Sequence, residues 1–228
     1  MSTATQKPDG ALTVWGVGTS RTLRAHWALA EVGAEYIRRP IGARTGETKS
    51  AEFTAITARQ KIPVLQHGDV VLTESLAIIA YVSDCFAADE NRLLPLDPLG
   101  RAHCLEWCAF ALTELDATSL YVIRRHRDLA HIYGAAPDVC EAAATYSGQQ
   151  MRALDRALSD GRTYILGDDF SAADIILSTC LDWARRYEVP VSTMAVAYNE
   201  RLTARPAFAI AKARNAPPET PAFQGLNP

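Results

Sequence analysis

The stretch KIPVLQHGDVVLTES, from Lys61 to Ser75, decides the fold of the first part of the chain. Proline cannot donate to a strand ladder, so Pro63 belongs at the start of a strand, at a sheet edge or at a bulge. A polar segment containing Gly68 separates two short apolar runs, which predicts a β-hairpin. Beyond Glu74 the apolar residues follow a helical spacing, so a helix is expected to begin directly after the hairpin.

The start of that helix offers two interpretations. The first backbone amides of a helix are unpaired and can hold an anion. The Glu74 carboxylate and the neighbouring Ser75 hydroxyl could therefore bind a ligand that carries both an ammonium and a carboxylate group. Alternatively, Ser75 or Thr73 only caps the helix, and Glu74 only interacts favourably with its dipole.

Length and composition limit the classes of function. A chain of 228 residues makes one large or two small domains. A net charge of −3 provides no basic field for nucleic acid or an anionic membrane. No apolar run approaches the about 20 residues that span a bilayer, and the first ten residues lack the apolar core of a signal peptide. We therefore expect a soluble, cytoplasmic protein.

The five cysteines form no Cys-x-x-Cys pair, and their odd number favours reduced thiols in the cytoplasm. Cys104 and Cys108 stand four residues apart on an expected helix, where His103 alone completes no metal-binding set. We expect buried, unreactive thiols and no metal site.

The secondary-structure pattern changes along the chain. Strands are expected at 12–15 and 34–41 and helices at 20–33 and 49–57, followed by the hairpin and its helix. The resulting order βαβαββα predicts an α+β domain over residues 11–86. A polar, proline-bearing linker is expected at 87–98, and an all-α domain at 99–214 with helices at 99–129, 137–158, 171–187, 192–203 and 206–214. Residues 1–10 and 215–228 are expected to be loose tails.

The sequence FSAAD marks the start of one of these helices. Ser171 is the expected N-cap and Asp174 occupies the N3 position. Phe170 and Ile175 stand at the two positions of a hydrophobic staple.

A second glycine-containing turn, WGVGTSR, follows the first expected strand. It is not a dinucleotide fingerprint, because Arg21 occupies the place of the third glycine. The turn delivers Thr19 and Ser20 to a helix start, where either could be the N-cap. Alternatively, one of these hydroxyls and the helix amides stabilise an anion. The hairpin belongs to the same small sheet, so both helix starts should converge on one edge.

These motifs, in this order, resemble the cytosolic glutathione transferase family. They are the order βαβαββα, the proline in KIPVL, TES at the next helix start, the acidic linker and FSAAD. The resemblance covers about residues 12–214. It implies a thioredoxin-like domain joined to a helical bundle, normally in a homodimer. It also implies transfer of glutathione, the co-substrate, to an electrophilic, partly apolar small molecule.

The resemblance assigns roles to individual residues. Pro63 matches a cis-proline that turns the Ile62 backbone towards the cysteinyl group of glutathione. Glu74 and Ser75 match the pair that holds the γ-glutamyl ammonium and carboxylate, and Asp174 matches a structural cap. The implied glutathione-binding residues are Lys49, Lys61, Ile62, Pro63, Glu74 and Ser75.

The first turn indicates the class within the family. Trp15 stands where tyrosine-type members have their tyrosine, and no cysteine precedes Cys85. The segment TSRTLRAHW, with Arg24 as its landmark, is similar to serine-type members (bacterial theta- and phi-like). Ser20 is the favoured activating hydroxyl and Thr19 the alternative. Lowering a thiol pKa by about two units requires about 2.7 kcal/mol, which one hydroxyl and a helix N-terminus can supply.

The electrophile is expected to bind between the first turn and the long helix. The candidates are Val17, Trp107, Phe110, Thr113 and Glu114. Core packing would equally explain Trp107 and Phe110. Three other functions stay open. The protein could be a glutathione-dependent disulfide reductase or peroxidase, or it could use the same thiolate for dehalogenation, isomerisation or ether cleavage. It could also be a non-catalytic ligand-binding protein of this fold.

Overall fold

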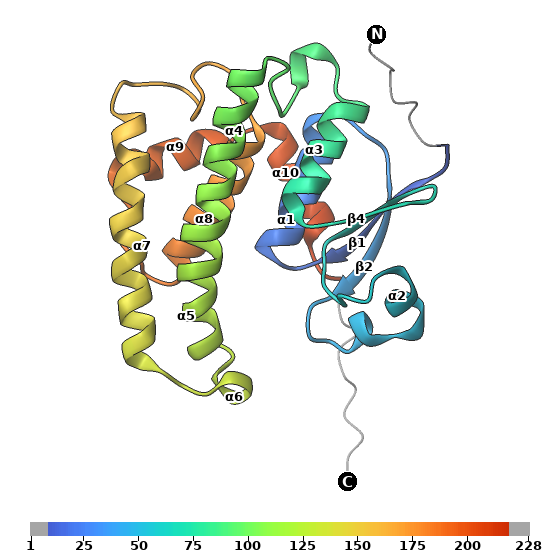
Figure 1. The fold of residues 1–228 in the computed structure, drawn as a ribbon, viewed down its shortest axis with the longest axis horizontal. Coiled ribbons are helices and arrows are strands. Elements are labelled where there is room, and N and C mark those ends of the chain that lie inside the picture. The colour runs from blue at the N-terminus through green and yellow to red at the C-terminus, as the bar shows by residue number, and fades with distance from the viewer. Residues whose placement is uncertain (1–8, 219–228) are drawn as a thin grey trace.

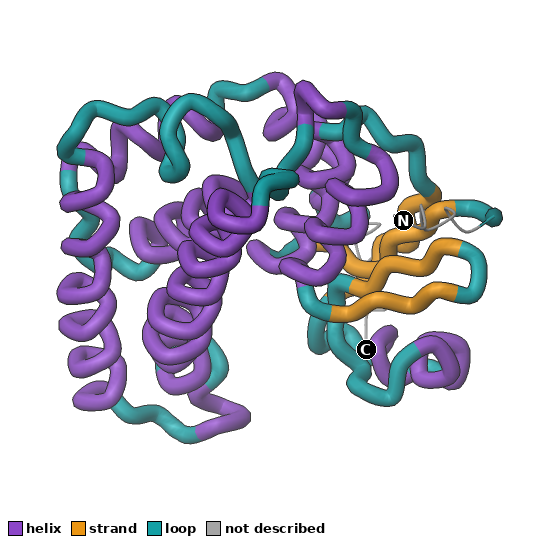
Figure 2. Tube along the Cα trace, turned by 45° about the horizontal axis from the view of Figure 1, so that its top comes forward, coloured by secondary structure: helices purple, strands orange, loops and turns teal. Residues whose placement is uncertain are grey.

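The computed structural model describes residues 9–218, which form a thioredoxin-like domain followed by an all-helical domain (Figure 1; Figure 2). The first domain contains β1 (Leu12–Val17), α1 (Ser20–Glu31), β2 (Ile37–Gly42), η1 (Glu47–Lys49), α2 (Ala51–Ile56), β3 (Val64–His67), β4 (Val70–Thr73) and α3 (Ser75–Phe86). After η2 (Asp89–Asn91) come α4 (Pro98–Phe110), η3 (Ala111–Leu120), α5 (Tyr121–His126), α6 (Ala130–Tyr133), α7 (Pro137–Leu158), α8 (Ala172–Arg186), α9 (Thr193–Thr203) and α10 (Pro206–Asn215). The predicted fold class is confirmed.

The sheet has the strand order β2-β1-β3-β4. Strand β1 runs parallel to β2 and antiparallel to β3, and β3 pairs with β4 in the predicted hairpin. Gly68 turns the hairpin with φ +57°, a conformation that glycine adopts without steric cost. The Ile62–Pro63 peptide bond is cis, as the family resemblance implies. Pro63 precedes β3, so its missing N–H removes no ladder bond.

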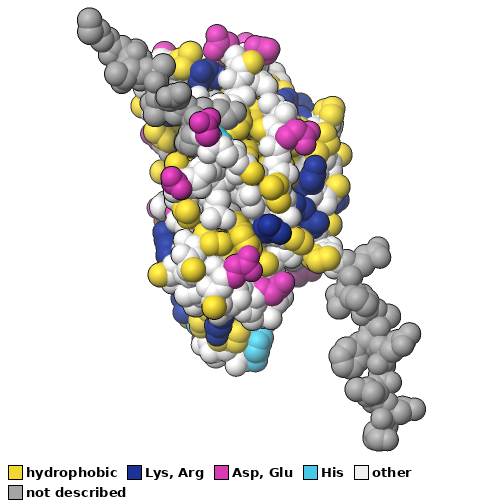
Figure 3. All heavy atoms as spheres, turned by 90° about the vertical axis from the view of Figure 1, so that its right-hand side faces the viewer, with side chains coloured by type: hydrophobic (Ala, Val, Ile, Leu, Met, Phe, Trp, Pro, Cys, Tyr) yellow, Lys and Arg dark blue, Asp and Glu magenta, His cyan; other side chains and the backbone are white. Residues whose placement is uncertain are grey.

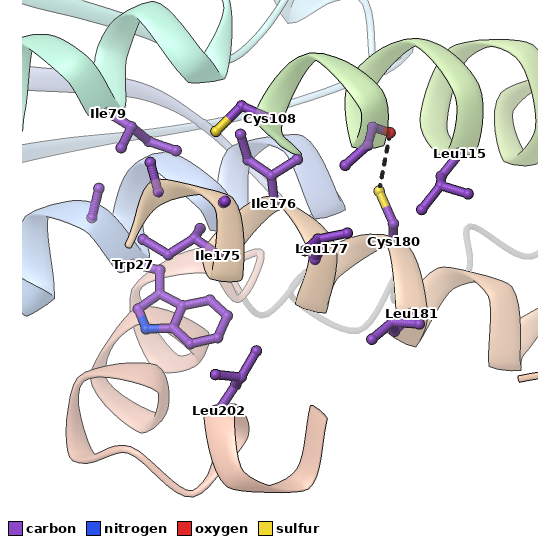
Figure 4. Close-up of a cluster of buried hydrophobic side chains, with 14 of the residues drawn as sticks. Trp27, Ile79, Cys108, Leu115, Ile175, Ile176, Leu177, Cys180, Leu181 and Leu202 are labelled. Carbon is purple, nitrogen blue, oxygen red and sulfur yellow. Dashed lines mark hydrogen bonds between the residues drawn. The ribbon is translucent and has the colours of Figure 1, made fainter. Parts of the chain in front are cut away.

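The largest core lies where helices of both domains meet (Figure 4). Trp27 of α1 is fully buried, and its ring packs edge-on against Phe208 of α10 with centroids 4.7 Å apart. Cys104 and Cys108 are fully buried, as predicted for unreactive thiols. Burial also raises the pKa of the Cys180 thiol to about 12. Its sulfur lies 3.6 Å from the Ala111 carbonyl oxygen, the contact drawn in Figure 4.

The helix expected over 99–129 ends at His126, and its middle is not α-helical. Residues of η3 adopt a π-helix, in which each N–H donates to the carbonyl five residues earlier. The backbone N–H of Tyr121 accordingly donates to the carbonyl of Asp116. The wider turn changes which side chains of this segment face the first domain.

The expected linker is held by specific hydrogen bonds. The Ser83 hydroxyl accepts from the backbone N–H groups of Leu93 and Leu94, both at 3.0 Å. The Leu93 carbonyl accepts from the N–H of Ala172 at 2.7 Å. Because Leu93 and Leu94 are also buried, this segment fixes the two domains to one another.

The expected loose tails lie largely outside the described residues, but the expectation is wrong for Asn215. This residue ends α10, and its carbonyl accepts a hydrogen bond from the N–H of Gly18 at 2.8 Å. Its side-chain amide donates to the carbonyl of Thr19 at 3.1 Å. The end of the helical domain therefore supports the first turn of the other domain. In the part of the chain that is described, no helix is long and apolar enough to cross a membrane.

The start of α8 confirms the predicted cap. The Asp174 carboxylate accepts hydrogen bonds from the N–H and the hydroxyl of Ser171, at 2.8 and 2.7 Å. It also accepts from the N–H of Ile165 at 2.9 Å and from the hydroxyl of Tyr198 at 2.6 Å. Burial raises the pKa of Asp174, and these hydrogen bonds oppose that shift.

We expect Asp174→Ala to lower the free energy of unfolding by about 3 kcal/mol or more, since each buried donor left unpaired costs about 1–3 kcal/mol. Urea denaturation measures the loss. Asp138→Ala is the matched control, because Asp138 is an exposed acid in the first turn of α7. Its removal should cost at most about 1 kcal/mol. Equal losses in the two variants would contradict the structural role of Asp174.

Candidate active site

A cleft of about 1120 Å³ lies between the two domains. The first domain lines it with the start of α1, the loop before η1, the Pro63 turn and the start of α3. The helical domain contributes η3, α5, α6 and α8. The cleft brings together these residues singled out in the sequence: Thr19, Ser20, Lys49, Lys61, Ile62, Pro63, Glu74 and Ser75.

The turn between β1 and α1 is fixed by close packing. Gly16 has φ +109°, and a Cβ there would stand 2.5 Å from the Cβ of Ile62, so only glycine fits. Nε2 of His26 lies 3.0 Å from the Gly16 carbonyl oxygen, and Nδ1 lies 2.7 Å from the Tyr36 hydroxyl. A neutral imidazole that donates from Nε2 and accepts at Nδ1 satisfies both contacts.

Thr19 is the N-cap of α1. Its hydroxyl accepts a hydrogen bond from the N–H of Thr22 at 3.0 Å, and its own N–H donates to the Thr22 hydroxyl at 3.0 Å. Oγ1 of Thr22 lies 2.7 Å from Oδ1 of Asn215. The Thr19 hydroxyl is therefore engaged in holding the helix start.

Ser20 is the first residue of α1, and its hydroxyl has a different environment. It accepts a hydrogen bond from the Arg186 guanidinium at 3.2 Å. Within residues 9–218 the Ser20 hydroxyl accepts this bond and donates none. It can therefore donate its hydrogen to an anion in the cleft, and the guanidinium polarises it for that role.

Glu74 and Ser75 stand at the start of α3. Ser75 is buried, whereas the Glu74 carboxylate is exposed and forms an ion pair with Arg59 at 2.6 Å. Glu74 has φ +69°, a backbone conformation that costs a non-glycine residue about 1–3 kcal/mol. Strained residues of this kind cluster at ligand sites, where the surrounding structure holds them.

A largely buried ion cluster lines one side of the cleft. The Asp116 carboxylate binds Arg24 at 2.8 Å and Arg21 at 2.5 Å, and Nε of Arg24 donates to the Thr179 hydroxyl at 2.7 Å. Burial alone would raise the pKa of Asp116, but attraction to the two guanidinium groups outweighs it and holds that pKa below its usual value. The sequence indicated Arg24 as a landmark only, and its partner on η3 was missed.

The structure does not place the expected electrophile-site residues in the cleft. Val17 is buried at the end of β1, and Trp107 packs edge-on against Phe110 with ring centroids 5.5 Å apart. The Thr113 hydroxyl donates to the Ala109 carbonyl, and Glu114 accepts from the Tyr146 hydroxyl. The wall is formed by other side chains of the long helical segment: Leu112, Asp116, Ala117, Tyr121 and Arg124. The spacing of these residues follows the π-helix. Continuing α-helical geometry beyond Phe110 would not predict that they share the side facing the cleft.

Comparisons with known proteins agree with the fold. Residues 10–84 match the glutathione S-transferase N-terminal domain family, and residues 141–209 match the C-terminal domain family. Glutathione S-transferase U24 of Arabidopsis thaliana is 30% identical over 73% of this chain and 69% of that protein. A probable maleylacetoacetate isomerase of Caenorhabditis elegans is 28% identical over 93% of this chain and 96% of that protein.

Solved structures show the same relationship. The theta class glutathione S-transferase of Xanthomonas axonopodis pv. citri, crystallised with glutathione bound, superposes with a TM-score of 0.73. It is 25% identical, and the match covers 88% of this chain and 96% of that one. The chain belongs to the glutathione S-transferase family. Across the described residues, no group of three or more His, Cys, Asp and Glu side chains could hold a metal ion.

The buried imidazole should make stability depend on pH. Burial and the charges of Arg38 and Arg214 lower the pKa of His26 to about 4, from an unfolded value of about 6.5. Between these values the unfolded chain binds the extra proton, so the free energy of unfolding should fall as pH drops, by up to about 3 kcal/mol. Urea denaturation from pH 7 to pH 4 measures this slope. His26→Gln should reduce it and the exposed-site control His131→Gln should not; an unchanged slope in His26→Gln would contradict the assignment.

Replacement of Glu74 tests its backbone strain. Glu74→Gly and Glu74→Gln both lose the ion pair to Arg59, but only glycine adopts φ +69° without steric cost. We expect the free energy of unfolding of Glu74→Gly to exceed that of Glu74→Gln by about 1 kcal/mol or more. Chemical denaturation of the two variants gives the comparison. A less stable glycine variant would show that the conformation carries no strain.

Proposed function

We propose that this protein is a glutathione transferase in which the Ser20 hydroxyl activates the thiol of glutathione. The observation that carries the proposal is the contrast between two neighbouring hydroxyls. Both residues line the cleft, but the Thr19 hydroxyl caps α1, whereas the Ser20 hydroxyl donates no hydrogen bond within residues 9–218. Among the relatives, the Xanthomonas protein holds glutathione, which supports glutathione as the co-substrate here.

The other cleft residues would hold the peptide. Glu74 and Ser75 would bind the ammonium and carboxylate of the γ-glutamyl group, and the backbone of Ile62 beside cis-Pro63 would pair with the cysteinyl group. Lys61 would help to hold the peptide, and Lys49 would attract the glycine carboxylate. All of these residues line one cleft, which supports a single binding mode that places the thiol near Ser20.

The energetics of thiol activation are within reach of these groups. A free thiol with a pKa of about 8.5 is only a few per cent thiolate at pH 7. A hydrogen bond from Ser20 to the thiolate supplies about 1.5–3 kcal/mol, and the start of α1 adds about 0.3–1 kcal/mol. Together they account for a decrease of about two units, which requires about 2.7 kcal/mol. The thiolate then attacks an electrophilic carbon, a C–S bond forms, and the leaving group departs with its electron pair.

The isomerase relative supports a second candidate reaction. The same thiolate could add reversibly to a conjugated double bond, allow rotation and then leave. Such a reaction would return glutathione unchanged, so a product without sulfur would distinguish it from transfer. Reduction of disulfides by two molecules of glutathione remains a further use of the same thiolate.

Two further properties belong to the proposal. The five cysteines of the described chain form no disulfide bond, which supports action in a reducing cytoplasm. Leu96, Leu99 and Leu105 are exposed near the start of α4, which supports a homodimer contact in this region. Sedimentation analysis would measure the oligomeric state.

Ultraviolet difference titration of bound glutathione tests the activating residue. We expect the pKa of the bound thiol to lie about two units below that of free glutathione. Ser20→Ala should return it to the free value and lower kcat/KM by about tenfold to a hundredfold at pH 6.5. Thr19→Ala should destabilise the helix start by about 1 kcal/mol but leave the thiol pKa low.

The opposite pattern would assign activation to Thr19, and Thr19→Ser serves as the control that keeps the cap. If glutathione binds with an unshifted thiol pKa in the wild type, the transferase proposal fails. The non-catalytic ligand-binding reading would then take its place.

A further inference from the structure

The cleft carries a concentration of positive charge that the whole chain does not. The protein has a net charge of −3, and the face turned to the viewer in Figure 3 shows acidic and basic side chains interspersed. In contrast, seven Lys and Arg side chains line the cleft together with two carboxylates, those of Glu74 and Asp116. Such a field raises the local concentration of anions.

The positive charge extends well beyond the part proposed to bind glutathione. Four of the cations, Arg21, Arg24, Arg44 and Arg124, lie on the side that the helical domain completes. Among the residues that line the cleft, Asp116 supplies the carboxylate on this side. It forms ion pairs with both Arg21 and Arg24. Four positive charges and one negative charge leave a local excess of three.

Arg44 and Arg124 form no ion pair with any described carboxylate. The Arg44 guanidinium donates instead to the Tyr121 hydroxyl at 3.1 Å. The Arg124 guanidinium lies 6.0 Å from the centroid of the Trp183 ring, and its Nε is buried with no hydrogen-bond partner within residues 9–218. A partly desolvated guanidinium without an acid is costly, so an anionic ligand would be stabilising here.

Aromatic surfaces stand beside these guanidinium groups. Arg21 lies over the Tyr121 ring at 4.5 Å and 5.9 Å from the centroid of the Trp183 ring. Tyr121 and Trp183 both line the cleft. Arg44 and Arg124, which have no ion pair, lie beside the same two rings, and Trp183 is itself 5% exposed. The wall therefore offers the Tyr121 ring and the accessible edge of Trp183 next to cationic donors, a combination that suits a flat molecule with a carboxylate at one end.

We propose that Arg44 and Arg124 bind a carboxylate of the second substrate, with its planar part against Tyr121 and Trp183. The substrate class is then a carboxylate-bearing aromatic or conjugated electrophile, which adds a charged group to the electrophilic, partly apolar molecule that the family resemblance implies. This inference rests on the proposed function for its reaction. Its binding step does not depend on thiol activation.

A matched pair of substrates isolates the charge. Glutathione attacks the benzylic carbon of 4-(chloromethyl)benzoate or of its methyl ester, the C–S bond forms, and chloride leaves with the electron pair of the C–Cl bond. Each kcat/KM is divided by the uncatalysed rate constant with glutathione, which removes differences in intrinsic reactivity. We expect the acid to be preferred by about tenfold or more, and the preference to shrink from 10 mM to 500 mM salt.

Charge-neutral variants identify the residues. Arg44→Gln and Arg124→Gln should each reduce the acid-to-ester preference, and the double variant should bring it close to one. Arg127→Gln is the matched control, because Arg127 stacks on Tyr187 at 4.1 Å and does not line the cleft. Comparing the two substrates within each variant cancels any general loss of activity.

Calorimetry separates this inference from the proposed function. Unreactive 4-methylbenzoate should bind the glutathione-loaded protein more tightly than its methyl ester, and the double variant should lose that difference. Equal affinity and equal kcat/KM for acid and ester would overturn the inference, even with the thiol pKa lowered. An unshifted thiol pKa with a retained acid preference in binding would overturn only the transferase reaction.

The carboxylate that binds Arg44 and Arg124 could also come from a second molecule of glutathione. Titration with glutathione alone distinguishes this ligand from the electrophilic substrate. A second binding event per subunit that disappears in the double variant would support the carboxylate site and assign it to glutathione.

Discussion

The Asp116 carboxylate joins the two domains where the cleft forms. It binds Arg24 and Arg21 from α1, while Arg24 also donates to Thr179 of α8. Removing one partner from such a buried pair leaves an uncompensated charge and typically costs about 3–5 kcal/mol. The contacts therefore fix the position of α1 relative to α8. The hydrogen bond between Ser20 at the start of α1 and Arg186 at the end of α8 depends on that position.

The π-helical segment explains how one stretch of chain serves both the core and the cleft. Leu115 and Leu120 are fully buried, whereas Leu112 and Tyr121 line the cleft. Five residues separate Leu115 from Leu120, and steps of four and five residues separate Leu112, Asp116 and Tyr121 on the cleft side, which suits the wider turn of a π-helix. The segment ALTELDATSL contains no proline or glycine to mark the change. The segment packs against α7 and α8, which are distant in the sequence, so its period could not be predicted from local sequence signals.

Features with local causes could be predicted from the sequence. Pro63 before an apolar run, Gly68 in the hairpin and Asp174 three residues after Ser171 each act on neighbouring backbone, and the structure confirms them. Asn215 could not be found in this way. Its partners Gly18 and Thr22 lie almost two hundred residues away in the chain, and the proline-rich segment that follows it suggested a loose tail.

The charge of the cleft connects thiol activation with the choice of electrophile. A thiolate and a carboxylate repel each other, by about 1 kcal/mol at 4 Å in water and by more in a partly desolvated cleft. This repulsion slows the uncatalysed reaction between two anions. Guanidinium groups on the wall offset it and also favour the thiolate over the thiol. A neutral electrophile gains only the second effect. The rate advantage over the reaction in water is therefore largest for an anionic partner, which gives a catalytic reason for Arg44 and Arg124 to lack acids of their own.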